Sequence, residues 1–426
     1  MISIYRHIMI YKHFFILRLE LEKCIFVLIF NKKNKHKIIM YTGKYVFSQV
    51  LEFVNKYEFN KCVARNNGDF RIHELDCWNQ FIQLFFGQLT SLESLRSICT
   101  CLKAHKGKLY HFSIKKNVVH TTLSRANENR TWQVFSDFGN YLIKLVRPLY
   151  ANYPIPNLTL ENEIFALDAT SISVSINLFT WALGKYSRGA VKMHTLIDLR
   201  GSIPEFILIS DGSCHDSNVF ESISFYANAI CLMDKAYVDF EALFRMNNAG
   251  AFFVTRAKEN MKYNVIEQNF NIDESTGLRA DKIVELSIPK SKRLYPGHLR
   301  LIEFYDVEND ELLVFMTNNF DVSALEIVFL YKNRWQIEVF FRWIKQNLTV
   351  KKLWGHSENA VKIHLWVAIC TYLIVAYIKH TLNSDLSIYD IMQILKISAF
   401  DKTPIRELLT KEIDNQTDTN QLTLFN

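Results

Sequence analysis

Residues 163–168 read Glu-Ile-Phe-Ala-Leu-Asp, and residues 229–234 read Ala-Ile-Cys-Leu-Met-Asp. Each is a short apolar run that ends in an aspartate, a pattern typical of a buried strand that leads to the edge of a sheet. In α/β proteins, sites form at the edge where parallel strands end. The two stretches therefore predict a sheet edge that carries Asp168 and Asp234. Taken singly, each aspartate can also be read as a turn residue or a helix cap.

The sequence around these stretches predicts a mixed α/β sheet with a meander at its front. Short apolar or β-branched runs bounded by Gly, Asp, Ser and Asn recur at 164–167, 191–199, 203–209, 230–233 and 251–255. A helix-like stretch, 238–246, separates the last two runs. Residues 258–318 carry more short alternating runs, which predict an inserted β region.

Helical periodicity marks the part of the chain before this sheet, residues 40–150. Residues 90–93 read Thr-Ser-Leu-Glu, a capping-box pattern that predicts a helix with Thr90 as its N-cap. A later helix displays Arg125 and Arg130. Short helices with a basic, amide-rich surface suit a helix-turn-helix-like reader of DNA, and a plain helical bundle fits the pattern as well.

The chain after the β-rich part is predicted to be helical again, first over 322–347 and then over 360–382 and 388–397. The longest apolar run, Leu365–Ile378, falls short of the ~20 residues that span a bilayer. It therefore predicts a buried core helix, and we expect no membrane segment.

The net charge of +7 is unevenly distributed along the 426 residues. Residues 1–39 hold eight of the 50 Lys and Arg residues but two of the 43 acidic residues, so residues 40–426 are nearly neutral. Overall charge is therefore weak evidence for a nucleic-acid partner. We expect residues 1–39 to be an extension before a true start at Met40, with a phosphate-binding basic arm as the alternative. The eight cysteines form no Cys-x-x-Cys pair, which favours reduced thiols and a cytoplasmic location.

One charged stripe lies on the helix predicted over 322–347. Tyr331, Arg334, Glu338 and Lys345 are spaced to share one helical face. A carboxylate among cations suits metal-assisted phosphate chemistry, and a solvated salt-bridged face is the alternative. The apolar residues that lie off the stripe, and can dock the helix, are Ile337, Phe340, Phe341 and Ile344.

If Asp168, Asp234 and Glu338 meet in space, their oxygens would suit hard cations such as Mg²⁺ or Mn²⁺. Three converging carboxylates also repel one another, so we expect the pKa of at least one to be raised. Lys192 and His194, on the predicted second strand, could approach the site, but we expect them in the first place to be residues of the strand surface. Similar aspartates that we treat as decoys are Asp198, Asp211 and Asp216.

The arrangement resembles bacterial insertion-sequence transposases of the DDE class, in the branch that bears a Tyr-Arg-Glu-Lys signature. The motifs that carry the resemblance are Asp168, Asp234-Lys235-Ala236-Tyr237 and Tyr331-x-x-Arg334-x-x-x-Glu338-x-x-x-x-x-x-Lys345. Further similar stretches are 43–47, 77–80, 126–130 and 192–198. The resemblance covers about residues 40–385, and Ala236 stands where members of this branch often have Gly.

This resemblance implies a ribonuclease-H-like catalytic core in which Asp168, Asp234 and Glu338 bind two Mg²⁺ or Mn²⁺ ions. Such an enzyme nicks the ends of its element and joins the freed 3′-OH to target DNA, in some relatives through a hairpin. The residues that would hold DNA are Tyr331, Arg334 and Lys345, with Trp335 stacking on an unpaired base unless it packs in the core. The expected partners are terminal inverted repeats and target DNA, bound by a homodimer on paired ends.

The expected organisation follows from the motifs and the resemblance together. Residues 40–150 would form a helical DNA-binding domain that uses Arg125 and Arg130. Residues 160–257 and 322–350 would form the catalytic core, 258–318 the β-rich insertion and 351–426 a C-terminal helical region. Two alternatives to an active cut-and-paste transposase are a structure-selective nuclease on the same fold and a catalytically silent DNA-binding copy.

Overall fold

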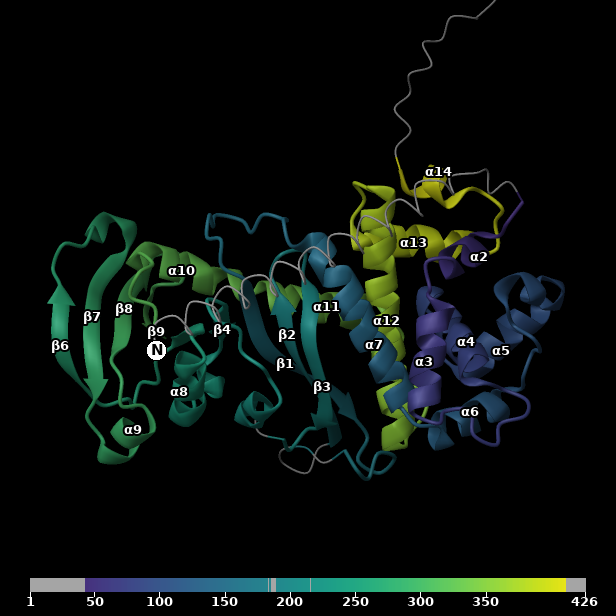
Figure 1. Ribbon diagram of the computed structural model, residues 1–426, viewed down its shortest axis with the longest axis horizontal. Coiled ribbons are helices and arrows are strands. Elements are labelled where there is room, and N and C mark those ends of the chain that lie inside the picture. The colour runs from purple at the N-terminus through teal and green to yellow at the C-terminus, as the bar shows by residue number, and fades with distance from the viewer. Residues whose placement is uncertain (1–42, 183, 185–188, 215, 411–426) are drawn as a thin grey trace, which may run out of the picture.

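The computed structural model describes residues 43–182, 184, 189–214 and 216–410. One mixed sheet of nine strands in the order β3-β2-β1-β4-β5-β9-β8-β7-β6 forms its centre (Figure 1). The expectations for residues 1–39 lie outside the described residues.

The first five strands fall where the sequence predicts them, which confirms the mixed α/β sheet with a front meander. They are β1 (Ile164–Val174), β2 (Gly189–Asp198), β3 (Ile203–Asp211), β4 (Ile230–Met233) and β5 (Phe252–Arg256). Strands β1, β2 and β3 pair antiparallel, whereas β4 lies parallel to β1 and β5 lies parallel to β4. The helix α8 (Phe240–Asn248) makes the crossover that a parallel pair needs.

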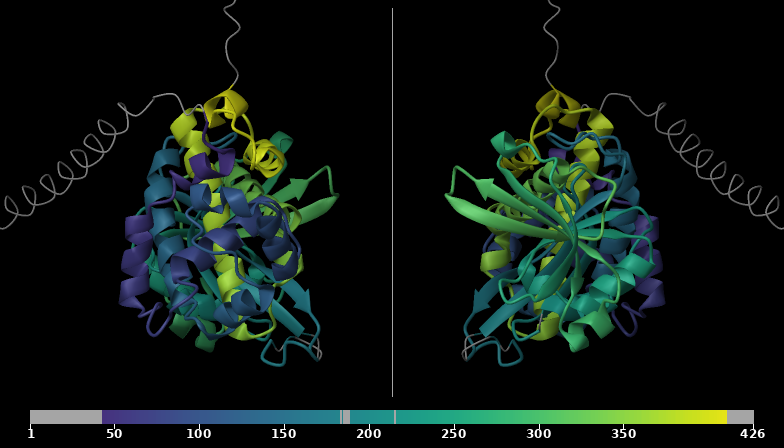
Figure 2. Two further views of the ribbon diagram at one scale, coloured as in Figure 1. Left: turned by 90° about the vertical axis from the view of Figure 1, so that its right-hand side faces the viewer. Right: turned by 90° about the vertical axis from the view of Figure 1, so that its left-hand side faces the viewer.

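The β-rich region continues the same sheet. It contains β6 (Tyr263–Asn269), β7 (Leu278–Leu286), β8 (Leu299–Asp306) and β9 (Glu311–Thr317), with the helix α9 (Pro289–Leu294) between β7 and β8. These four strands pair antiparallel, and β9 pairs with β5. The predicted strands are therefore present, and they fan out with the twist of the whole sheet (Figure 2).

Two helices, α10 (Ala324–Asn333) and α11 (Gln336–Asn347), replace the single helix predicted over 322–347. The prediction of one unbroken helix was wrong at Arg334 and Trp335. There the backbone amides of Ile337 and Glu338 bond three residues back, to Arg334 and Trp335, so the chain tightens for one turn. Helix α11 packs on β1, whereas α10 packs on β5 and β7.

The remaining helices come from both ends of the described chain and lie together at one end of the sheet (Figure 1). Helix α12 packs against α4, α6, α7 and α13, so the helical segments before and after the sheet share one core. The helices are α2 (Val46–Leu51), α3 (Lys56–Arg65), α4 (Cys77–Leu89), α5 (Leu95–Ala104), α6 (His120–Asn129), α7 (Gln133–Val146), α12 (Glu358–Leu382), α13 (Ile388–Ser398) and α14 (Ile405–Leu409). Short 3₁₀ turns are η1 (Lys106–Phe112), η2 (Arg147–Tyr150), η4 (Asp216–Glu221), η5 (Lys235–Tyr237), η6 (Glu274–Thr276) and η7 (Thr349–Lys351).

Helix α12 is the one described helix whose length and composition would allow it to cross a membrane. Its apolar window is 89% buried inside the protein. The predicted core helix over Leu365–Ile378 is therefore confirmed.

The capping box predicted at residues 90–93 was wrong. Thr90 ends α4, and its hydroxyl donates a hydrogen bond back to the carbonyl of Phe86. The true N-cap of α5 is Ser94, whose hydroxyl accepts from the amide of Ser97. A threonine whose hydroxyl bonds the carbonyl four residues back, at the end of a helix, cannot be told from an N-cap threonine by local sequence. The left-handed φ of 54° at Ser91 turns the chain between the two helices.

Candidate active site

Asp168 and Asp234 lie side by side because β1 and β4 are parallel neighbours. Leu167 pairs with Met233 across these strands, which puts the two aspartates at the next position of each chain. Strand β4 ends there, but β1 runs on to Val174 beside β2, so the expectation that Asp168 ends its strand was wrong. Asp168 instead lies within β1, at the position where the parallel strand β4 ends.

Helix α11 brings the third carboxylate, that of Glu338, to Asp168. The Arg334 guanidinium joins the two, with Nη1 3.1 Å from Asp168 Oδ2 and Nη2 2.7 Å from Glu338 Oε1. The predicted docking residues are all buried against the core: Ile337, Phe340, Phe341 and Ile344. Apolar packing therefore fixes the helix, and the arginine bridge fixes which of its turns faces β1.

The pKa of Asp168 is raised, mainly because the carboxyl group is buried. Glu338 and Asp234 raise it further, whereas the guanidinium of Arg334 and the amide of Ala169 lower it. A raised pKa at one of the three acids was predicted, and its direction is confirmed. The predicted cause, repulsion between carboxylates, is present but is smaller than the cost of desolvation.

The other members of the predicted stripe surround this bridge. Tyr331 is partly buried on α10, with the guanidinium of Arg334 5.7 Å from its ring. Lys345 lies in the last turn of α11 and is partly exposed. Trp335 is 51% exposed, which excludes the alternative that it packs in the core. The guanidinium of Arg342 lies 5.8 Å from the Trp335 ring.

The side chains of Lys192 and His194 lie on the opposite face of the sheet. Thr195 pairs with Asp168 across β1 and β2, so its neighbour His194 points away from Asp168. His194 is fully buried, so the expectation of a strand-surface position was wrong for it, and burial lowers its pKa to about 4. The amine of Lys192 donates to Asp216 at 2.7 Å.

The decoy aspartates have local partners. Asp211 accepts from the amide of Ser213 at 2.8 Å. Asp216 pairs with Lys192, and Asp198 pairs with Arg147. None of these three partnerships includes Asp168, Asp234 or Glu338, so the decoys are separate from the site.

The two arginines predicted to bind DNA from the N-terminal helices differ. Arg125 is exposed on α6. Arg130 is 7% exposed, and its guanidinium donates to Gln80 Oε1 at 2.9 Å and to the carbonyl of Leu75. We therefore correct the expectation for Arg130, whose bonds hold the end of α6 to α4. The spacing of the basic residues along α6 does not reveal which one turns inward.

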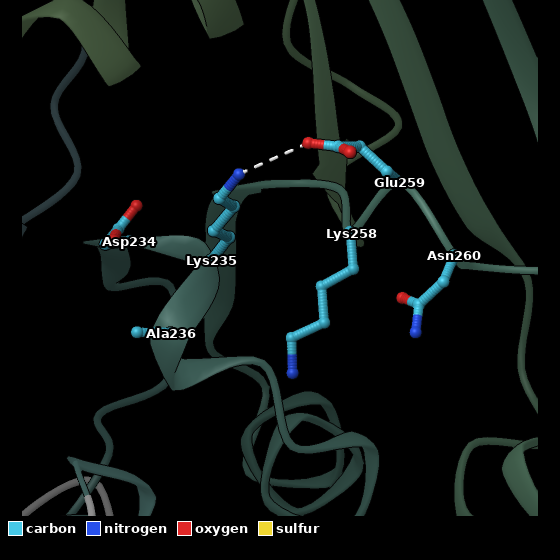
Figure 3. A pocket seen from close by; sticks show the side chains of 6 residues that line it. All are labelled: Asp234, Lys235, Ala236, Lys258, Glu259 and Asn260. Atoms are coloured by element: carbon cyan, nitrogen blue, oxygen red, sulfur yellow. Dashed lines mark ion pairs between the residues drawn. The ribbon is translucent and has the colours of Figure 1, made fainter.

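An open hollow of about 450 Å³ adjoins Asp234 (Figure 3). Its lining comes from the turns that follow β4 and β5, namely Asp234, Lys235, Ala236, Lys258, Glu259 and Asn260. The sequence interpretation missed Lys258 and Asn260, because they follow a strand that ends without an acidic residue. The parallel pairing of β4 and β5 places them beside Asp234.

Within the described parts of the chain, no group of three His, Cys, Asp or Glu side chains is close enough together to hold a metal ion. At the three acids the reason is visible, because Arg334 stands between Asp168 and Glu338. Six of the described cysteines are free thiols: Cys62, Cys77, Cys99, Cys101, Cys231 and Cys370.

Two family profiles match the chain. The profile described as "Transposase DDE domain" matches residues 159–374, and one described as a domain of unknown function matches residues 42–115. The first spans all nine strands, both α10 and α11, and most of α12.

Curated relatives carry transposase names. A protein named as transposase y4zB of Sinorhizobium fredii is 32% identical over 48% of this chain and 58% of its own length. One named for insertion sequence element IS5377 of Geobacillus stearothermophilus is 31% identical over 52% and 58%, and one named for IS4SA of Synechocystis sp. is 28% identical over 60% and 70%. The chain thus spans less than two thirds of the length of the first two relatives. Among solved structures, the piggyBac transposase synaptic complex with hairpin DNA matches 87% of this chain and 84% of its own, with a TM-score of 0.41 and 9% identity.

Proposed function

Because this chain belongs to the transposase DDE domain family, we propose that it is the transposase of an insertion sequence. It would bind the terminal inverted repeats of its element, cut the DNA strands there and join them to target DNA. The observations that carry the proposal are the adjacent positions of Asp168 and Asp234 after parallel strands and the Arg334 bridge that links Asp168 to Glu338.

The strand order supports a ribonuclease-H-like core for residues 160–257 and 322–350. Strands β3-β2-β1 form an antiparallel meander, and β4 and β5 continue it in parallel. We assign β6 to β9, within 258–318, as the β-rich insertion. The Tyr-Arg-Glu-Lys spacing on α10 and α11 supports assignment to the branch with that signature.

The donor set fits two Mg²⁺ or Mn²⁺ ions, because three carboxylates offer the hard oxygen ligands that these cations prefer. Asp168, Asp234 and Glu338 would hold them. When bound, such ions activate an attacking oxygen and stabilise the leaving oxygen of a phosphodiester. Arg334 already places a positive charge between two of these acids, which indicates a site that attracts cations.

The side chains around the acids would orient DNA. Once Arg334 leaves the acids, its guanidinium can bind two oxygens of one phosphate in a fork, and Lys345 can bind as a point charge. The half-exposed ring of Trp335 offers a surface on which an unpaired base can stack. The phenol of Tyr331, beside Arg334, would help to fix the position of that arginine.

The helical N-terminal region, residues 40–150, would bind the part of the terminal inverted repeat that lies outside the active site. Within residues 40–150, Arg125 on α6 is the exposed cation that we assign to this contact. We propose DNA as the partner, a homodimer on paired ends as the working assembly, and the cytoplasm as the location. The C-terminal region, 351–426, contributes α12, against which the N-terminal helices pack.

A cleavage assay on the gene with its own flanking DNA tests this function. The expected result is metal-dependent cutting at the ends of the element, which Asp234→Asn abolishes. Asp401→Asn is the matched control. It is an isosteric change of an exposed aspartate in the C-terminal helical region, and it should leave cutting intact. Loss of a catalytic carboxylate removes a metal ligand but little volume, so the variant should remain folded.

Two other outcomes would contradict the proposal. Cutting of branched DNA without any need for the ends would identify a structure-selective nuclease. Binding of the ends without cutting, in both Mg²⁺ and Mn²⁺, would identify a catalytically silent DNA-binding protein.

A further inference from the structure

The hollow beside Asp234 lies between the ends of two parallel strands. Met233 pairs with Thr255 across β4 and β5, so the turn after β5 that carries Lys258 stands next to the turn after β4. The acids occupy the same edge one strand earlier, between β1 and β4. Adjacent strands are about 4.8 Å apart, so the hollow is the next position along the edge from the carboxylates.

The walls of the hollow carry the ammonium groups of Lys235 and Lys258 beside the carboxylates of Asp234 and Glu259. The amine of Lys258 donates to the carbonyl of Val238 at 3.0 Å, a neutral acceptor that leaves the ammonium charge unbalanced. The amine of Lys235 lies 3.6 Å from Glu259, whose side chain is 94% exposed, so that pair is weakened by solvent. Figure 3 shows Lys258 and Asn260 pointing away from this pair, on another side of the hollow.

One lining position of the hollow, residue 236, is small. Ala236 contributes one methyl group to the lining. A larger side chain there would fill space that is now free for a ligand.

We propose that this hollow binds the phosphodiester next to the one that is cut, in the same DNA strand. Lys235 and Lys258 would bind its phosphate oxygens, and Asn260 would bond the neighbouring sugar or base. A strand laid along the sheet edge would meet the acids and then the lysines, so binding in the hollow would set which phosphate lies over the acids. This inference rests on the proposed function, since it takes Asp168 and Asp234 as the place of cutting.

The test measures binding of a short fluorescein-labelled single-stranded oligonucleotide by the full chain in EDTA, across a range of salt concentrations. Each phosphate contact on a single strand contributes about 0.7 to the slope of log K against log salt. Lys235→Gln and Lys258→Gln should each reduce the slope by about that amount. Lys290→Gln, which changes an exposed lysine of α9 outside the hollow, is the matched control and should leave the slope unchanged.

Two further variants separate a built site from general attraction to positive charge. Ala236→Leu leaves the charge unchanged but fills the hollow, and it should lower the slope by at least as much as one lysine variant. Glu259→Gln frees Lys235 from its ion pair and should tighten binding at low salt. An unchanged slope in Ala236→Leu, with melting temperature unchanged, would overturn the proposal even if the lysine variants bind less.

The outcomes also separate this inference from the proposed function. A wild-type protein that cuts its ends, with lysine variants that keep the wild-type slope, overturns the inference alone. A wild-type protein that binds no DNA overturns both.

Discussion

Two of the described arginines at this sheet, Arg147 and Arg334, each bridge more than one acidic residue, and they differ in how completely they are bonded. Arg147 contacts three acids, with Nε 2.9 Å from Asp198, Nη1 2.8 Å from Glu205 and Nη2 2.6 Å from Glu163. Arg334 contacts two acids through its Nη atoms, and its Nε is buried without a hydrogen-bond partner.

The acids differ in the same way. Asp198 is 5% exposed and also accepts from the amide of Arg200, and Glu205 is 17% exposed, so the Arg147 cluster is closed on two of its three acids, with Glu163 at its rim. Glu338 is 48% exposed and can leave Arg334 for another ligand without a large movement. A fully bonded arginine stabilises a fold, whereas a partly bonded one with an exposed acid on one side, as Arg334 has in Glu338, can be exchanged for a cation or moved to a phosphate.

The largest expected effect comes from breaking the closed cluster. Arg147→Gln leaves Asp198 buried without its countercharge, and the free energy of unfolding should fall by about 3 kcal/mol. Urea unfolding followed by circular dichroism measures the change. Arg334→Gln should cost less than this, because Glu338 is half-exposed and can turn to water, so that only Asp168 loses a countercharge in a buried position. Equal losses in the two variants would contradict the distinction between the clusters.

The open cluster should instead respond to metal. Arg334→Gln removes a cation that competes for Asp168 and Glu338, through two charge-assisted hydrogen bonds worth about 1.5–3 kcal/mol each. The affinity of the DNA-free protein for Mn²⁺ should therefore rise by about tenfold or more, since tenfold corresponds to about 1.4 kcal/mol. Isothermal titration calorimetry measures it without any need for activity.

The matched control for that titration is Arg342→Gln. Arg342 is exposed on α11 and lies near Trp335 rather than the acids, so its loss should leave Mn²⁺ binding unchanged. Weaker binding in Arg334→Gln would mean that the arginine holds the acids in place for the ions and does not compete with them.

The same comparison shows what sequence reasoning could reach. The apolar runs that end at Asp168 and Asp234 predicted both strands, because alternation and punctuation are local properties of the chain. The spacing of Arg334 and Glu338 predicted that they share a helical face, and they do so through the i, i+4 bridge. The contact from Arg334 to Asp168 spans 166 residues and could be expected only from the family resemblance.

What the sequence could not predict depends on long-range packing. Arg125 and Arg130 are alike in pattern, yet one is exposed and the other bonds Gln80 inside the protein. Nothing in the local sequence distinguishes Lys258 from other lysines that follow a strand. The parallel pairing of β4 and β5 places it beside Asp234. In both cases the function of a cation is decided by which distant segment lies next to it.

The smallest expected effect tests the cost of keeping Asp168 charged. Its pKa is raised by burial, so between the ordinary value and the raised one the folded protein holds a proton that the unfolded chain has lost. Stability therefore falls as the pH rises through that interval, and above it the charged carboxylate is a constant penalty.

Asp168→Asn should stabilise the metal-free protein at neutral pH by less than about 1 kcal/mol. The gain should shrink at acidic pH, where the wild-type carboxyl is already protonated, and melting temperatures at the two pH values measure it. If Asp168→Asn lowers the melting temperature, and lowers it more at neutral than at acidic pH, the bond from Arg334 outweighs burial, and the open cluster stabilises the fold as the closed one does.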